Sequence, residues 1–244
     1  MKTAGLLTAL RFGDSAFPGG GFAFSQGLEG LAPLRGATPD ADAVAAFLDE
    51  QISHRWGPAE RVTLVRCHRA AGTGGAAADD DGADTAMDEG ALDAVAALDR
   101  DLDLSTFSQT LRRGARRNGA AFLAAHLRLG TPGAGAYRGR IASGAAPGTL
   151  AAIQGLLWRR AGLDETEAAA LAGYQLVAGG LTAATRLGLV GALGAQALMP
   201  VLLGRVADVV SRPVAADEEP SGFSPYAEIA AARQARLPLR LFSN

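Results

Sequence analysis

The sequence predicts an all-α protein in one domain. Its 244 residues suit one large domain. Apolar residues recur at the i, i+3, i+4 spacing of amphipathic helices, and no series of alternating strands separates them. Aromatic residues make up 6% of the chain and β-branched residues are few, which disfavours a sheet. The many glycine and alanine residues are expected to let the helices pack closely.

The first half begins with an apolar, glycine-rich block at residues 6–30. Asp40 is expected to cap a helix whose apolar positions run from Val44 to Ile52. Gly57 and Pro58 are expected to end it, and a second helix is expected over residues 59–70.

Residues 72–90 differ from the rest of the chain. They are almost entirely Gly, Ala and Asp, so they offer little to bury against the entropy of ordering. We predict a mobile acidic loop without function. Weak cation binding by residues 79–81 is the alternative, although the run lacks the ligand spacing of an EF-hand.

Further helices are expected over residues 92–98, 105–129 and 149–161, with a Gly/Ala-rich connection at 133–148. Asp164 is expected to cap another helix, since acids suit its first turn.

The last part of the chain combines a proline-containing helix with a short final one. Pro200 should kink or divide the helix at 195–210, and residues 211–222 read as a loop. Ser224 and Pro225 are typical of a helix start, here for a short helix that ends near Gln234.

Two uncharged stretches, residues 168–185 and 187–204, are long enough to span a membrane. They are rich in Ala and Gly and contain Gln175, Gln196 and Pro200. This composition favours buried helices of a soluble protein over a membrane hairpin. The N-terminus lacks a secretory signal pattern, so a cytoplasmic protein is expected.

Composition excludes several classes of function. The net charge of −2 argues against a globally basic nucleic-acid binder. Cys67 is the single cysteine, so neither an intrachain disulfide nor a cysteine-based zinc cluster can form. Lys2 is the only lysine, which removes P-loop and Schiff-base chemistry from the interior.

Ser25 lies in a variant of the G-x-S-x-G nucleophile motif. A serine hydrolase would need a preceding strand and one of the three histidines, His54, His68 or His126. The pattern favours the alternative, in which Ser25 caps a helix that contains Glu29.

Two further clusters have structural and functional interpretations. His54, Cys67 and His68 could bind nickel or zinc, but neighbouring helical residues point about 100° apart. We therefore expect Cys67 in the core and His68 on the surface.

A stripe of arginines on one predicted helix comprises Arg112, Arg113, Arg116 and Arg117. It could bind an acidic partner or phosphate, or be a solvated helix face beside the acidic loop.

Residues 14–29, DSAFPGGGFAFSQGLE, closely resemble the N-terminal signature of the urease accessory protein UreF family. Later matches in order and spacing support the resemblance: Leu111, Arg112 and Gly119, then Tyr174, Arg186, Leu187 and Gln196, then Glu228, Ile229, Arg233, Leu241 and Phe242. The chain departs from the family where a His-Glu pair is replaced by Gln234 and Ala235, and an Asp by Glu228.

The resemblance implies one all-α UreF-like domain of about 8–10 helices over residues 1–244, with a partner-docking tail at 223–244. It implies a non-catalytic homodimer, without a cofactor of its own, that binds the UreD/UreH scaffold and recruits the GTPase UreG. Nickel would be cargo delivered to apo-urease. Partner-binding residues are expected to be Phe22, Phe24, Ser25, Gln26, Glu29, Arg112, Arg116, Arg186, Gln196, Glu228, Arg233, Leu241 and Phe242.

Three expectations are more specific. An arginine supplied to UreG in trans would be Arg112 or Arg116. Phe22 and Phe24 are expected as core anchors or interface contacts. Leu241 and Phe242 are expected to be buried mainly by a partner.

Overall fold

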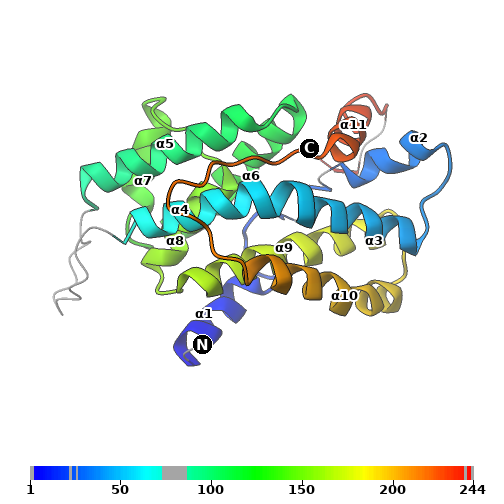
Figure 1. The fold of residues 1–244 in the computed structure, drawn as a ribbon, viewed down its shortest axis with the longest axis horizontal. Helices are drawn as coiled ribbons and strands as arrows, with labels where there is room; N and C mark the ends of the chain where they lie inside the picture. The colour runs from blue at the N-terminus through cyan, green and yellow to red at the C-terminus, as the bar shows by residue number, and fades with distance from the viewer. Residues whose placement is uncertain (1–2, 22–23, 26, 73–86, 239–240, 243–244) are drawn as a thin grey trace.

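The computed structural model describes residues 3–21, 24–25, 27–72, 87–238 and 241–242. This part of the chain is helical and contains no strand, which confirms the all-α prediction (Figure 1). The α-helices are α1 Thr3–Gly13, α2 Leu31–Arg35, α3 Ala41–Glu50, α4 Arg61–Ala70, α5 Glu89–Ser105, α6 Gln109–Arg128, α7 Ala134–Ala142, α8 Leu150–Arg160, α9 Glu165–Arg186, α10 Ala192–Val210 and α11 Pro225–Gln234. A 3₁₀ turn covers Leu28–Gly30, and a π-helical segment covers Gln51–Glu60.

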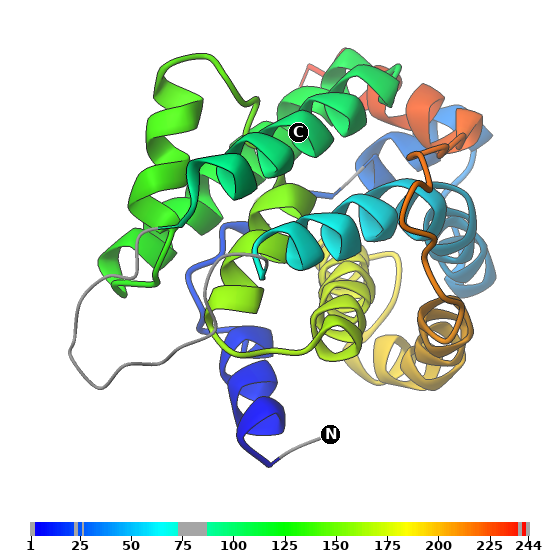
Figure 2. The ribbon, with the colours of Figure 1, turned by 60° about the vertical axis from the view of Figure 1, so that its left-hand side comes forward.

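Helix α8 lies at the centre of the fold, between α4, α6 and α9 (Figure 2). Residues 151–158 are all buried, and Trp158 is among the largest fully buried side chains. Burying such apolar side chains is the main favourable contribution to folding. Helix α9 is also enclosed, by α1, α4, α8 and α10, so the first uncharged stretch is a core helix of this fold.

Glycines allow the central helices to approach closely, as predicted. A Cβ at Gly155 would lie 2.3 Å from the carbonyl oxygen of Leu64, so α8 packs directly on the backbone of α4. On α9, a Cβ at Gly173 would lie 2.3 Å from Val206 of α10. The small residues therefore set the distance between helices.

The predicted break at Pro58 is wrong, because the chain stays helical from Ala41 to Ala70. Pro58 lies in the π-helical segment, whose wider turn accommodates a ring that would crowd the preceding turn of an α-helix. Two backbone N–H groups from a distant part of the chain donate to this segment: Phe223 N to His54 O at 2.8 Å, and Ser221 N to Pro58 O at 3.1 Å.

Residues 211–224, which we call the crossing segment, run from α10 across α4 to α11 (Figure 1). Three arginines of α4 donate to its carbonyl oxygens: Arg61 to Arg212 at 2.9 Å, Arg66 to Glu218 at 2.8 Å, and Arg69 to Val214 at 2.9 Å. Arg69 also forms a two-pronged pair with Glu165. Bonds from a charged donor are stronger than neutral ones, so they hold the segment in place.

Helix starts were predicted well. The Asp40 carboxylate accepts from Ala43 N at 2.9 Å, and Asp164 and Glu167 form a reciprocal capping box. Pro225 begins α11 as expected, although the hydroxyl of Ser224 donates to Glu50 at 2.7 Å instead of capping.

Other expectations need correction. Part of the Gly/Ala-rich connection forms α7, because Tyr137 is buried and its hydroxyl donates to the carboxylate of Asp99 at 2.6 Å. That carboxylate also accepts from the backbone of Gly148 and Thr149, so a buried contact overrides weak local propensity.

Pro200 does not divide α10, which continues as one helix. This helix is mostly exposed and not buried as expected; by length and composition alone it could also cross a membrane, which is weak evidence. The acidic residues 73–86 lie outside the described residues.

His126 occupies an aromatic box next to α1. Its ring lies 5.0 Å from that of Phe12 and 4.5 Å from that of Phe122, measured between centroids. Nδ1 contacts the hydroxyl of Thr131 at 2.8 Å. Burial, and then the charge of Arg11, lower the pKa of His126 to about 4.

We expect Gly155→Ala to lower the free energy of unfolding by about 1–3 kcal/mol, because its Cβ would meet backbone and not a movable side chain. Gly179→Ala is the matched control in a helix interior, with nothing within 4 Å of the new Cβ. It should stabilise by up to about 1 kcal/mol through helix propensity. Urea denaturation measures both; equal effects would contradict the close approach of α4 and α8.

The burial of His126 in its aromatic box predicts that the folded protein loses stability in acid. As pH falls below about 6.5, the unfolded chain takes up a proton that folded His126 accepts only near pH 4. Stability should therefore fall across this window, by about 3 kcal/mol at most. Urea denaturation of His126→Phe should show a flatter pH dependence. His54→Gln, which replaces an exposed histidine, is the matched control.

Candidate functional site

The N-terminal motif folds into a tight turn. Gly27, at φ +95°, precedes the 3₁₀ turn Leu28–Gly30. The carbonyl of Ser25 accepts from Leu28 N at 3.0 Å, and its hydroxyl accepts from Glu29 N at 3.4 Å. Ser25 contacts the first turn, but Gly27 takes the N-cap position, so the prediction that Ser25 caps this helix is wrong.

Helix α11 packs on the glycines of this turn. A Cβ at Gly30 would lie 1.9 Å from the carbonyl oxygen of Ala230, and one at Gly27 would lie 3.1 Å from that of Ala227. Gly27 also needs its left-handed conformation, which disfavours other residues. The two glycines, three residues apart, therefore form a flat seat for α11.

Gln234, fully buried at the end of α11, joins the turn by hydrogen bonds. Its Oε1 accepts from the Ser25 hydroxyl at 3.1 Å, and its Nε2 donates to Glu29 Oε2 at 2.8 Å. The Glu29 carboxylate also accepts the backbone N–H groups of Leu241, at 2.6 Å, and Phe242, at 3.3 Å. One side chain therefore holds both α11 and the chain end beyond it.

Phe242 completes the contact, with the guanidinium of Arg186 4.4 Å from its ring centroid. We call this set the tail-docking site: Ser25, Gly27, Glu29, Gly30, Arg186, Gln234, Leu241 and Phe242. The expectation that a partner buries Phe242 is wrong, because its own chain leaves it 3% exposed. Leu241 is 51% exposed and stays open to a partner.

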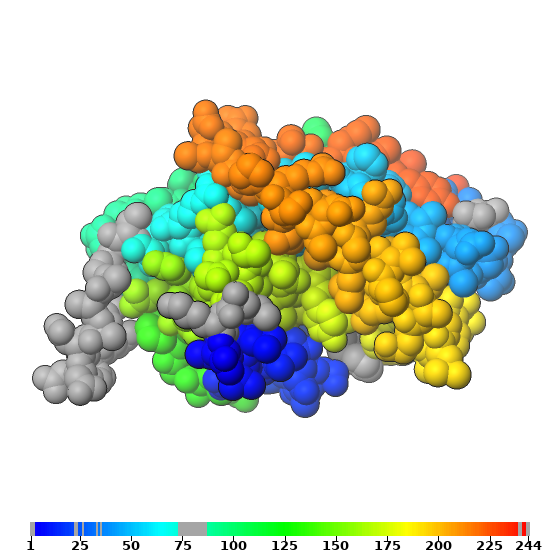
Figure 3. All heavy atoms as spheres, turned by 60° about the horizontal axis from the view of Figure 1, so that its bottom comes forward, coloured from blue at the N-terminus to red at the C-terminus, as the bar shows by residue number. Residues whose placement is uncertain are grey.

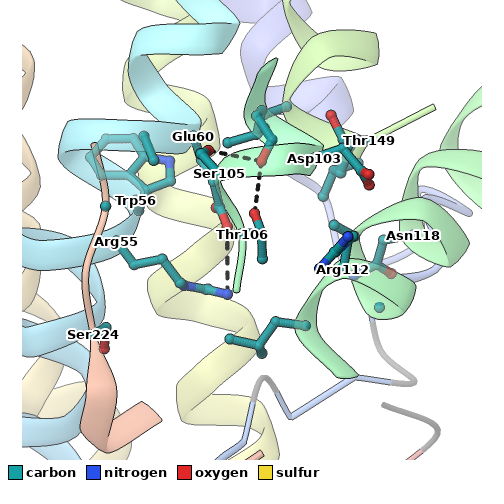
Figure 4. Close-up of a pocket in the computed structure, with 18 of the residues that line it drawn as sticks. Arg55, Trp56, Glu60, Asp103, Ser105, Thr106, Arg112, Asn118, Thr149 and Ser224 are labelled. Carbon is teal, nitrogen blue, oxygen red and sulfur yellow. Dashed lines mark hydrogen bonds and ion pairs between the residues drawn. The ribbon is translucent and has the colours of Figure 1, made fainter. Parts of the chain in front are cut away.

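A second feature is a cleft between α6, the π-helical segment and the start of α11, which we call the α6 cleft (Figure 4). Its floor is apolar, with Leu64, Leu102, Leu111 and Leu150. Charged side chains lie at its walls: Arg55, Glu60, Asp103, Arg112 and Glu228.

Ion pairs account for part of this charge. Arg116 binds Asp103 with two nitrogens, at 2.7 and 2.5 Å, so it is engaged within the chain. Arg55 pairs with Glu60 at 3.5 Å. Burial raises the pKa of Glu228, and the charge of Arg55 opposes that rise.

The other predicted residues are divided between these regions. Phe24 is half-buried and lines the α6 cleft with Arg112 and Glu228. Arg233 and Gln196 are exposed on α11 and α10. Phe22 and Gln26 lie outside the described residues.

Ser25 has the surroundings of a structural hydroxyl. It is 2% exposed, and its hydroxyl contacts Gln234 and the Glu29 N–H. The described part of the chain has no strand to form a nucleophile elbow. His68 contacts the carbonyl of Leu163 at 2.9 Å, and His126 lies in its aromatic box.

The expected surface position of His68 is wrong, because its side chain is 3% exposed and its ring contacts the carbonyl of Leu163. Cys67 is in the core as predicted, where burial raises the pKa of its thiol. No group of three or more His, Cys, Asp or Glu side chains in the described ranges could hold a metal ion.

Comparison with known proteins places this sequence in a family. The UreF family model matches residues 39–202. The chain belongs to the UreF family. It is 29% identical over 241 residues to urease accessory protein UreF 1 of Brucella melitensis biotype 1, covering 98% of this chain and 93% of that one. It is 28% identical over 245 residues to UreF of Trichodesmium erythraeum, covering 98% and 96%.

Most of the tail-docking site lies outside residues 39–202, and the two UreF relatives align with 98% of this chain. Gln234 stands where the resemblance places a histidine. A glutamine amide offers a donor and an acceptor, and so does neutral imidazole. Gln234 uses both, toward Glu29 and Ser25. Sequence reasoning treated Gln234 only as a departure and missed its role.

We expect Gln234→Ala to release the tail, because it leaves the Ser25 hydroxyl and the Glu29 carboxylate without this amide. The free energy of unfolding should fall by about 1–3 kcal/mol. Hydrogen exchange should become faster at the amides of Leu241 and Phe242.

Two variants control this experiment. Arg233→Ala changes the exposed neighbour on α11 and should leave exchange unchanged. Gln234→His should restore most of the protection, since it again supplies one donor and one acceptor. Slow exchange at the tail amides in Gln234→Ala would show that the amide does not hold the tail.

Proposed function

We propose that the chain is a non-catalytic adaptor in urease maturation that binds the UreD/UreH scaffold and positions the GTPase UreG. In this proposal the chain acts in the cytoplasm, and nickel is cargo that the complex delivers to apo-urease. The coarser statement, that it is a urease accessory protein of the UreF family, rests on the comparisons above.

The tail-docking site is the observation that carries the proposal. It joins the N-terminal motif and the C-terminal residues, both of which resemble the family, into one surface unit. Apolar side chains remain exposed on or beside α11: Phe223 at 64%, Ile229 at 49% and Leu241 at 51%. Exposed apolar side chains that together form a patch are typical of protein interaction sites.

Helix α10 supports dimer formation. Leu193 is 87% exposed and Val201 71% exposed on α10, whose residues are largely apolar. Figure 3 shows this helix at the surface of the molecule. In the proposal, a second copy of the chain covers this face. Covering it in a soluble dimer also explains how so apolar a helix can act in the cytoplasm.

The proposal gives the chain no catalytic residue and no metal ligand. Any effect on GTP hydrolysis would come from positioning UreG. Arg112 and Arg116 stay the candidates for a direct contribution, and Arg116 would first have to leave Asp103.

The proposal predicts a stable complex with the scaffold. Co-expression with UreD/UreH from the same genome, then size-exclusion chromatography with light scattering, should give a complex with two copies of each chain. Added UreG should join it. The physical basis is burial of the apolar surface around α11.

Deletion of residues 237–244 removes Leu241 and Phe242 and should abolish or strongly weaken scaffold binding. Arg113→Ala, at an exposed position on α6, is the control and should bind normally. If the full-length chain bound neither UreD/UreH nor UreG, this result would contradict the proposal. The family assignment would remain.

A further inference from the structure

Two residues that line the α6 cleft each carry a buried polar atom with no hydrogen-bond partner. These atoms are Nε of Arg112, a donor, and Oδ1 of Asn118, an acceptor. Asn118 is 8% exposed, so water has little access to its side chain. Leaving such groups unpaired costs free energy, which a ligand with matching groups would recover. Figure 4 shows both residues on one side of the cleft, opposite Arg55 and Trp56.

The surroundings of the cleft are apolar and exposed. Phe107 is 75% exposed and follows the lining residue Thr106. Phe223 is 64% exposed and lies between the lining residues Gly222 and Ser224. Ile229 follows the lining residue Glu228 and is 49% exposed. A small ligand inside the cleft would leave these side chains in water, whereas a macromolecule would cover them.

The charges and the apolar lining of the cleft indicate which class of macromolecule would bind there. Its walls carry charges of both signs, among them Arg55, Arg112, Glu60 and Glu228, which does not favour a polyanion such as nucleic acid. Its apolar floor suits a large hydrocarbon or aromatic side chain. An unpaired donor and an unpaired acceptor match the C=O and N–H groups that an extended polypeptide backbone presents.

We propose that the α6 cleft receives an extended segment of the scaffold partner, which inserts one large apolar side chain between α6 and the π-helical segment. The inference rests on the proposed function, because it takes the scaffold as the partner. Backbone groups of that segment accept from Arg112 Nε and donate to Asn118 Oδ1. Phe107, Phe223 and Ile229 form the surrounding contact. The cleft is then the anchor point of the interface and the tail-docking site lies beside it.

A variant that fills the cleft tests the proposal. Ala115 lines the cleft from α6, so Ala115→Leu occupies the space of the incoming side chain without removing a charge. Co-purification with UreD/UreH and measurement of the dissociation constant should show at least about tenfold weaker binding. Ala120→Leu, the same change at an exposed position of α6 outside the cleft, should bind like the wild type.

Asn118→Ala provides a second measurement if Ala115→Leu fails to fold. It removes the unpaired acceptor and should weaken scaffold binding, while circular dichroism reports a folded chain. Wild-type affinity in a folded Ala115→Leu, or in Asn118→Ala if that is the variant measured, would overturn the cleft inference and leave the proposed function standing. A wild-type chain that does not bind the scaffold would overturn both.

Discussion

The crossing segment depends on hydrogen bonds from α4, and the position of α11 depends on the crossing segment. Phe223 and Ser221 donate backbone N–H groups to the carbonyls of His54 and Pro58. Arg61, Arg66 and Arg69 bind carbonyl groups further back along the same segment. Because backbone atoms are the acceptors, the attachment does not depend on which side chains the loop carries.

The position of α11 then brings the two ends of the chain together. Gly27 and Gly30 allow the helix backbone to touch the N-terminal turn, and Glu29 binds the chain beyond the helix. The same helix and the crossing segment supply one wall of the α6 cleft, through Gly222, Ser224 and Glu228. The two surface features are therefore mechanically linked. A partner that binds one of them contacts elements that also build the other.

Local signals in the sequence predicted the helix class and several boundaries, because caps act within a few residues of chain. Asp40 and Asp164 cap their helices as expected. The errors occur where contacts between distant residues determine the structure. The buried Tyr137 of α7 donates to Asp99, and the segment that contains Pro58 accepts backbone hydrogen bonds from Ser221 and Phe223. His68 was expected on the surface, but Leu163, remote in sequence, covers it. Propensity has no information about such contacts.

The sequence by itself determined that this is a helical, nearly neutral protein with one cysteine, and its motifs pointed to the UreF family. It also identified Ser25, Glu29, Arg186 and Phe242, but not that they meet. Only the tertiary structure brings these residues into contact and places Gln234 between Ser25 and Glu29. It also leaves one buried atom each of Arg112 and Asn118 without a hydrogen-bond partner. Hydrogen bonds between residues some two hundred positions apart depend on how helices pack in three dimensions. A local sequence pattern cannot encode that arrangement.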